Sequence, residues 1–320
     1  MIQAMTVRAL AVISTALLLG ACAGGPASPG TVQMVQMAQN VPLVIAHRGG
    51  TADAPENTLA AIRTALANHA DAIWLTVQLS RDGVPVLYRP ADLAALTDAR
   101  GPIASKTAAE LAKVNAGWQF KAQDAWPYRR SPVGIPTLAQ ALSVIPVDTL
   151  VVLDMKALPA APQAAAVAQV LDDADAWHRV LLYSTEAAYQ QAFAAWPRAR
   201  VFESRDATRG RLATVALAHA CEAPPAAGAW TAFEWRRKVD LTERFTLGEA
   251  HSTVNDAQLW TRQAVQCFRT QPRVHIVAIA VNSAADYKAA ACAGVDAVLA
   301  DSPREMTAVR DALKKGYRCP

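Results

Sequence analysis

The residues best suited to do chemistry lie together near the start of the expected folded region. His47 and Arg48 follow the apolar run 43–45 and precede two glycines, and a helix pattern opens soon afterwards at Glu56. In α/β proteins, groups that bind anions are placed where a buried strand ends. The stretch therefore predicts a strand, a turn and a helix that together present a site for an anion.

The composition indicates a large globular chain. Of its 320 residues, 52% are hydrophobic and 18% are charged, so a sizeable core is expected and wholesale disorder is excluded. This length suits two average domains or one barrel of about 250 residues. The formal net charge of +4 is small and the basic residues are dispersed, so no nucleic-acid partner is predicted.

The first residues have the pattern of an export signal. Residues 1–21 carry one positive charge, Arg8, followed by an apolar run over 9–19 that is too short to anchor the chain across a bilayer. The sequence ending at Cys22 resembles a bacterial lipobox, which implies cleavage before that cysteine and lipid attachment to it. The alternative is an ordinary signal peptide with a chance cysteine. Because no Asp follows Cys22, we expect a lipoprotein of the cell envelope, anchored in the outer membrane and facing the periplasm.

The segment 22–40 is rich in small residues, Gly and Pro, which is typical of a flexible tether, and the folded domain is expected over 41–320. Four cysteines fall in this domain: Cys221, Cys267, Cys292 and Cys319. In an oxidising compartment they allow three pairings. We favour Cys221 with Cys267, because Cys292 lies in a helix pattern that reads as buried.

From residue 41 onward, apolar runs of strand length alternate with helical patterns, as in a parallel α/β fold. The tight turn 81–83 predicts a hairpin whose second arm, 84–88, is antiparallel, followed by an irregular excursion over 90–136. Apart from that arm, eight strands are expected, at 42–47, 71–79, 150–154, 179–183, 200–203, 230–235, 274–281 and 296–300.

Eight β/α units predict a TIM-type (β/α)8 barrel with a small hairpin and loop insertion after its second strand. An active site would then lie at the C-terminal ends of the strands. The alternative is an open doubly wound sheet, against which no G-x-G-x-x-G motif follows the first strand.

The motifs HRG and PENTL within 43–62 resemble the opening of the glycerophosphodiester phosphodiesterase (GDPD) family. The resemblance continues through SRDGVPVLY at 80–88, IPTL at 135–138 and GVDAVLADSP at 294–303. It implies a phospholipase-C-like TIM barrel that hydrolyses glycerophosphodiesters in lipid metabolism. In the family, three carboxylates hold Mg²⁺ or Ca²⁺ against the phosphate, and two histidines act as base and acid.

Several family positions are retained. His47 and Arg48 match the first catalytic histidine and the arginine that contacts phosphate. Glu56 matches the acid of PENTL, and Asp154 with Lys156 matches an acid-x-lysine pair. The resemblance therefore implies that His47 and Arg48 are catalytic residues, and that Glu56 and Asp154 are the remaining acids of the site. We expect Asp154 to pair with Lys156 or Arg48.

Other family positions have changed. Trp74 and Thr76 occupy the places of two metal-binding carboxylates, and Arg89-Pro90 replaces the His-Asp pair that carries the second histidine. Only Asp154 remains as a possible metal ligand. We therefore expect Mg²⁺ or Ca²⁺ not to be retained and the metal-dependent hydrolysis to be crippled, as in a pseudoenzyme.

Two hypotheses describe the resulting pocket. In the first, His47, Arg48, Arg89 and Lys156 converge on a phosphate-bearing ligand, with Trp74 as an apolar wall, because arginine can neutralise phosphate without a metal. In the second, these residues only fill a barrel that serves as a structural or binding lipoprotein. Metal-free hydrolysis with two histidines, as in the related bacterial phosphoinositide phospholipases, would need the second histidine from elsewhere, for example His251 in a loop after the sixth strand.

The remaining acids have simpler expected roles. Glu234 could form an acid/base pair with His251, but a salt bridge with Arg236 or Arg237 is the favoured interpretation. Asp301-Ser302-Pro303 closes the last strand, where we expect it to cap the final helix at 303–314.

Overall fold

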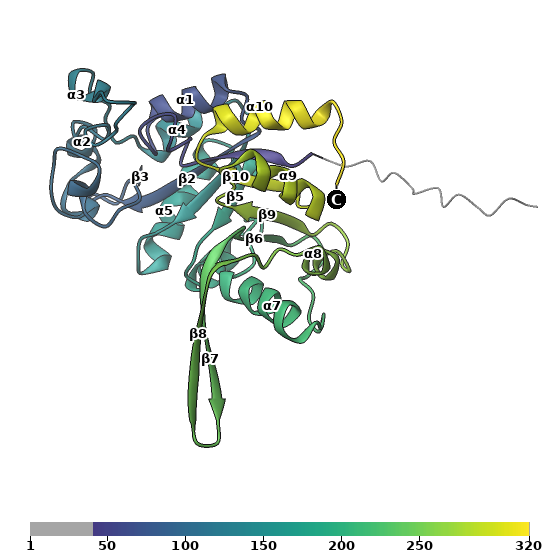
Figure 1. Ribbon diagram of the computed structural model, residues 1–320. Coiled ribbons are helices and arrows are strands. Elements are labelled where there is room, and N and C mark those ends of the chain that lie inside the picture. Colours follow the sequence, from purple (N-terminus) through teal and green to yellow (C-terminus); the bar gives the residue numbers. More distant parts are fainter. Residues whose placement is uncertain (1–40, 320) are drawn as a thin grey trace, which may run out of the picture. The chain divides into compact units, whose positions relative to one another are not determined.

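The computed structural model describes residues 41–319, which fold around a curled parallel β-sheet (Figure 1). Its parallel strands are β1 (Leu43–His47), β2 (Ala72–Leu79), β4 (Leu150–Met155), β5 (Val180–Tyr183), β6 (Trp230–Glu234), β9 (His275–Ile279) and β10 (Ala297–Ala300). Neighbouring strands follow the order β5-β4-β2-β1-β10-β9-β6. Seven of the eight expected strands are thus confirmed.

The eighth expected strand, 200–203, forms only an isolated parallel bridge between Leu182 and Val201. Its backbone nevertheless contacts both edges of the sheet. Phe202 N–H donates to Leu182 O at 2.9 Å, and Glu203 N–H donates to Trp230 O at 2.9 Å. One short segment therefore joins β5 to β6, which fits a TIM-type barrel and not an open doubly wound sheet.

The insertion after β2 is confirmed. Strand β3 (Pro85–Leu87) pairs antiparallel with β2, with Leu87 opposite Val77. The excursion that follows holds the turns η1 (Leu93–Ala95) and η2 (Ile103–Ser105) and the short helices α2 (Ala108–Leu111) and α3 (Pro127–Arg130). It has its own small core, in which Tyr88 packs with Leu93 and Ile103.

Helices alternate with the strands of the barrel. They are α1 (Leu59–Ala67), α4 (Leu138–Val144), α5 (Ala160–Asp173), α6 (Ala188–Ala192), α7 (Arg205–Ala218), α8 (Arg262–Phe268), α9 (Ala284–Ala293) and α10 (Pro303–Lys314), with the short turns η3 (Trp177–Arg179) and η4 (Phe193–Ala195). Ser or Thr side chains cap most of the longer ones. At α10, Ser302 Oγ accepts from Glu305 N–H at 3.2 Å. The expectation that the segment Asp301-Ser302-Pro303 caps this helix is therefore confirmed, with Ser302 as the capping residue.

The barrel interior is apolar up to its C-terminal mouth. Ile45, Trp74, Leu181 and Tyr183 belong to one buried cluster there. Two larger clusters pack the outer face of the sheet against the helices. Side chains alternate between the two faces of a strand. A strand-end residue two positions after a member of this cluster therefore faces the same side and lies at the mouth.

A long hairpin follows β6 and was not expected. Strands β7 (Arg237–Phe245) and β8 (Gly248–Ala257) pair only with each other and project from the barrel in green in Figure 1. The alternation of Val239 and Leu241 with charged residues is the period-2 signal that could have indicated it. His251 therefore lies on a strand of this hairpin and not in a loop.

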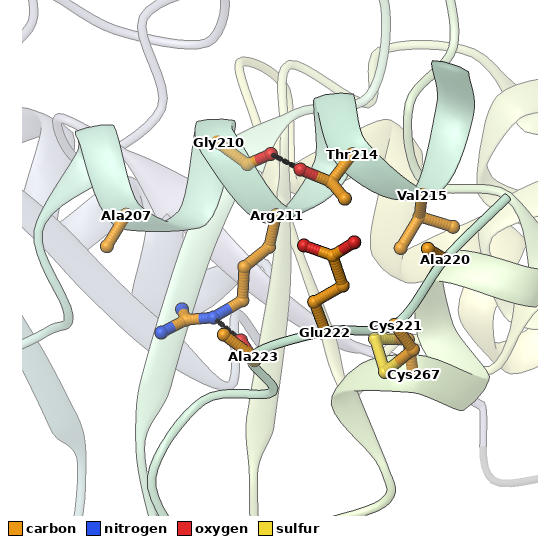
Figure 2. Close-up of a pocket in the computed structure, with 10 residues that line it drawn as sticks. All are labelled: Ala207, Gly210, Arg211, Thr214, Val215, Ala220, Cys221, Glu222, Ala223 and Cys267. Atoms are coloured by element: carbon orange, nitrogen blue, oxygen red, sulfur yellow. Dashed lines mark hydrogen bonds between the residues drawn. A yellow bond between two sulfur atoms is a disulfide. The ribbon is translucent and has the colours of Figure 1, made fainter. Parts of the chain in front are cut away.

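The structure contains two disulfides. Cys221–Cys267 confirms the favoured pairing, with Cα atoms 5.5 Å apart. Figure 2 shows it beside a surface pocket of about 280 Å³ against α7, across which Arg211 donates to the carbonyl of Ala223. Cys292 pairs with Cys319 and is half-buried, so the expectation of a buried Cys292 is wrong.

The expected signal peptide, the tether and Cys22 lie outside the described residues. Among residues 41–319, the structure has no helix with the length and apolar character that a membrane crossing requires.

Candidate active site

Parallel pairing brings the strand-end side chains together at the mouth. His47 on β1 is level with Trp74 on β2, and Thr76 on β2 is level with Asp154 on β4. Asp154 is in turn level with Tyr183 on β5. Paired residues of neighbouring strands face the same side of a sheet, so these five side chains line one end of the barrel.

His47 is held by Asp301. Its Nδ1 lies 2.6 Å from Asp301 Oδ1, and Asn282 Nδ2 donates to Asp301 Oδ2 at 2.7 Å. The hydrogen bond from His47 lowers the pKa of the Asp301 carboxyl, and Thr51 and Asn282 act in the same direction. The carboxylate therefore fixes the imidazole ring, and the other ring nitrogen, Nε2, has no hydrogen-bond partner within residues 41–319.

Arg48 is paired within its own loop. Its Nη1 donates to Glu56 Oε2 at 2.6 Å, and both side chains are largely buried. The backbone of Arg48 is left-handed, with φ of 53°, and its carbonyl accepts from Asn57 N–H at 2.7 Å. This strained turn fixes Arg48 beside His47, with guanidinium donors left over for a ligand.

Lys156 pairs with Asp154, as the sequence indicated. The two charged groups lie 3.1 Å apart, and only 8% of Asp154 is exposed. Burial is the main cause that raises the pKa of this carboxyl, while the charge of Lys156 opposes the rise. The pair leaves the mouth less positive than the sequence alone suggested.

Aromatic side chains fill the mouth. Trp74 is 2% exposed, and its ring centroid lies 4.8 Å from that of Tyr183 and 5.9 Å from that of Phe202. Burial raises the pKa of the Tyr183 hydroxyl to about 12, so this phenol stays protonated at neutral pH.

These residues do not fit a divalent metal. Within residues 41–319, no three His, Cys, Asp or Glu side chains are grouped as metal ligands. Four polar atoms of this site are buried without a hydrogen-bond partner within residues 41–319: Thr76 Oγ1, Asn57 Nδ2, Glu56 Oε1 and Asp154 Oδ1. An amide nitrogen is not a ligand for Mg²⁺ or Ca²⁺, which require oxygen. The two carboxylates already face the cations Arg48 and Lys156 at 2.6 and 3.1 Å, so the set is poorly suited to a divalent metal.

A further ion pair on this rim was missed. Arg205 Nη2 lies 2.5 and 2.6 Å from the two carboxylate oxygens of Glu234. The expected salt bridge of Glu234 with Arg237 is also confirmed, at 3.6 Å. Arg236 instead binds Asp286 and Asp256 at 2.8 and 3.0 Å. The only sequence signal for the missed pair was the position of Arg205 just after the segment 200–203.

Arg89 lies apart from the histidine. It is exposed, has no ion-pair or hydrogen-bond partner within residues 41–319, and lines a groove of about 900 Å³ together with Lys156. His47 and Arg48 do not line this groove. The structure thus gathers His47, Arg48, Trp74 and Asp154 with Lys156 at the mouth, and places Arg89 in the neighbouring groove.

His251 is exposed on the projecting hairpin (Figure 1). Its Nδ1 lies 3.1 Å from Thr242 Oγ1, and its Nε2 lies 3.8 Å from Glu249. Glu234 is occupied by Arg205. The structure therefore brings His251 to neither His47 nor Glu234.

Comparisons with known proteins agree on one family. Residues 47–305 match the model described as the glycerophosphoryl diester phosphodiesterase family. The uncharacterized protein Rv2277c of Mycobacterium tuberculosis is 48% identical over 264 residues, which is 82% of this chain and 87% of that protein. Glycerophosphodiester phosphodiesterase 1 of Rattus norvegicus is 40% identical over 99 residues, 31% of this chain and 29% of that protein.

Solved structures agree with the fold. The glycerophosphoryl diester phosphodiesterase domain of Rv2277c has a TM-score of 0.80 at 46% identity and covers 84% of this chain and 99% of its own. An Oleispira antarctica phosphodiesterase, solved with the product sn-glycerol-3-phosphate, has a TM-score of 0.61 at 24% identity and covers 85% of this chain and 97% of its own.

Proposed function

The chain belongs to the glycerophosphoryl diester phosphodiesterase family, and we propose that it binds and slowly hydrolyses a glycerophospholipid-derived phosphodiester without a divalent metal. The observation that carries this proposal is the His47–Asp301 hydrogen bond of 2.6 Å at the mouth of the barrel. A histidine whose Nδ1 is held by a carboxylate has its Nε2 oriented for proton transfer.

In this reaction His47 Nε2 takes a proton from the attacking water as the oxygen–phosphorus bond forms. Arg48 and Lys156 neutralise the phosphoryl oxygens. Both are already paired with carboxylates, at 2.6 and 3.1 Å, so they are positioned before the ligand arrives.

The leaving alcohol takes its proton from solvent, because Arg89-Pro90 stands where the family has its second histidine. A positioned proton-transfer group contributes about 10²–10⁴-fold to a rate. We therefore propose an enzyme slower than relatives with both histidines by about that factor.

We place this activity at the cell envelope. The lipobox-like sequence ending at Cys22 supports a lipid anchor to the membrane, where such phosphodiesters arise. The dispersed charges and small net charge support a small phosphate-bearing ligand as partner, with no nucleic acid.

A second candidate function is binding of a phosphate or phospholipid headgroup without hydrolysis. It is favoured by Trp74, which packs on Tyr183 and Phe202 where metal-binding relatives need a carboxylate. A barrel of this kind would act as a non-catalytic envelope lipoprotein.

The two candidates separate in one assay. Purified protein is incubated in EDTA with a panel of glycerophosphodiesters, and release of sn-glycerol 3-phosphate is measured. Hydrolysis predicts release that His47→Ala abolishes and His251→Ala, an exposed histidine on the hairpin, leaves intact. No release by wild type, with a rise in Tm on adding sn-glycerol 3-phosphate that Arg48→Ala removes, would support binding alone.

A further inference from the structure

The charged side chains that line the groove beside the mouth are all positive. The groove occupies about 900 Å³ between β2, the β2–β3 turn, the segment 102–104 and the loop after β4. Three cations line it, Arg81, Arg89 and Lys156, and none of its lining residues is Asp or Glu. A cleft lined by one sign of charge concentrates ligands of the opposite sign.

The three cations are not equally available. Arg81 binds Glu110 at 3.2 Å and the carbonyl of Ser105 at 3.1 Å. Lys156 binds Asp154 at 3.1 Å. Arg89 is exposed and has no hydrogen-bond or ion-pair partner within residues 41–319, so its guanidinium is free for an anion there. A guanidinium binds phosphate through two parallel hydrogen bonds.

Apolar side chains also line the groove. They are Leu158, Pro159 and Pro162 after β4, and Pro102 and Ile103 in the insertion, of which Ile103 is only 1% exposed. Leu158 is 61% exposed, so its side chain is accessible to a ligand in the groove. None of the lining residues is aromatic, so a nucleotide base would find no ring on which to stack.

The groove adjoins the mouth through one residue. Lys156 lines the groove while its Nζ pairs with Asp154, which is level with Thr76 and Tyr183 at the mouth. A ligand whose phosphate lies between Arg89 and Lys156 can therefore extend along Leu158 without leaving the rim.

We propose that this groove binds a phosphate-bearing lipid with one aliphatic chain. Its phosphate lies at Lys156, the residue that the groove shares with the mouth, with Arg89 contacting it from the groove and Arg48 from the mouth, and its chain lies against Leu158, Pro159 and Pro162. This proposal rests on the proposed function in one respect, the glycerophospholipid origin of the ligand. It assigns the acyl-bearing form, and not the water-soluble glycerophosphodiester alone, as the preferred ligand.

The test is a binding series with matched probes: sn-glycerol 3-phosphate, 1-hexanoyl-lysophosphatidate and 1-hexanoylglycerol, measured by titration calorimetry with the purified protein. Each methylene buried against these apolar side chains strengthens binding by up to about fourfold. We expect lysophosphatidate to bind at least about tenfold more tightly than glycerol 3-phosphate, and the uncharged hexanoylglycerol to bind more weakly than either phosphate.

Two variants test separately the contacts of the phosphate and of the acyl chain. Arg89→Glu should weaken both phosphate probes at least about tenfold, whereas Arg63→Glu on the exposed face of α1 should change neither. Leu158→Asp should remove the preference for the acyl chain, whereas Leu217→Asp, with 66% exposure on α7, should preserve it.

The proposal is overturned if glycerol 3-phosphate and lysophosphatidate bind equally, or if Arg89→Glu changes neither. Hydrolysis fails separately. Acyl-dependent binding with no turnover of any phosphodiester would support the lipid-binding groove and refute the proposed hydrolysis. Turnover of glycerophosphodiesters with no acyl preference would support hydrolysis and refute the lipid-binding groove.

Discussion

His47 Nδ1 lies 2.6 Å from Asp301 Oδ1, although 254 positions separate the two residues in the chain. The contact follows from the sheet. Strand β1 pairs with β10 so that Ala46 is level with Ala300, and the next residue of each strand then meets the other at the mouth. The first and last strands of the barrel thus complete one functional unit.

Asp301→Asn should lower kcat about 10²-fold with little change in KM, because Asp301 orients His47 and does not touch the ligand. Asp301→Glu should recover part of the rate and of its pH profile. A purely structural role for Asp301 would instead lower Tm and leave the kcat of the folded fraction unchanged. That result, measured with active-site titration, would contradict the orienting role.

Asp154→Asn should become more stabilising as the pH rises. Burial raises the folded-state pKa of Asp154, so the folded protein favours the protonated carboxyl. The contribution of this group to the free energy of unfolding is fully present below the unfolded pKa near 3.9, and it is lost as the pH rises through the folded-state pKa. An asparagine cannot ionise. The Tm of the variant relative to wild type should therefore increase over the pH range above about 4, where the unfolded carboxyl is ionised.

A matched control is Asp124→Asn, which removes a fully exposed carboxylate that also pairs with a lysine, Lys121, at 3.3 Å. Its Tm difference should stay nearly constant across the same range, because surface pairs contribute little. A flat or opposite trend for Asp154→Asn would show that Lys156 outweighs burial.

Removing the first disulfide by Cys221→Ser with Cys267→Ser should lower the free energy of unfolding by about 4 kcal/mol, the value expected for a closed loop of 46 residues. Denaturant unfolding in oxidising buffer measures it. The pair Cys292→Ser with Cys319→Ser, which opens a 27-residue loop, should cost slightly less. Unchanged stability in both would refute the two crosslinks.

Restoring the family residues together should create metal dependence. The variant carries Trp74→Glu, Thr76→Asp, Arg89→His and Pro90→Asp. Asp154 then gains two carboxylate neighbours for a hard cation, and the second histidine returns. We expect hydrolysis that rises with Mg²⁺ or Ca²⁺. A folded variant that stays inert with both ions would show that the scaffold itself no longer positions the site.

Much of the fold could be predicted from the sequence because apolar runs locate buried strands directly. The retained motifs also located His47, Arg48 and the Asp154–Lys156 pair. The partner of His47 could not be found in this way. Asp301 stands just before α10 and reads locally as a cap, and only the register of β1 against β10 brings it to the histidine.

Two other features depended on tertiary structure. Arg205 reaches Glu234 because the segment 200–203 sits beside β6, a placement set by two backbone hydrogen bonds that no periodicity encodes. The projecting hairpin was missed because its exposed strands have few large apolar residues, and exposed Leu247 at its tip belongs to no buried run.

We infer that phosphodiester chemistry at this mouth needs no divalent metal. The direct measurement is the initial rate of glycerophosphodiester hydrolysis by wild type in EDTA and then with Mg²⁺ or Ca²⁺ in excess. We expect a slow rate that is equal in all three conditions and is lost in His47→Ala. A rate abolished by EDTA and restored by either ion would contradict it.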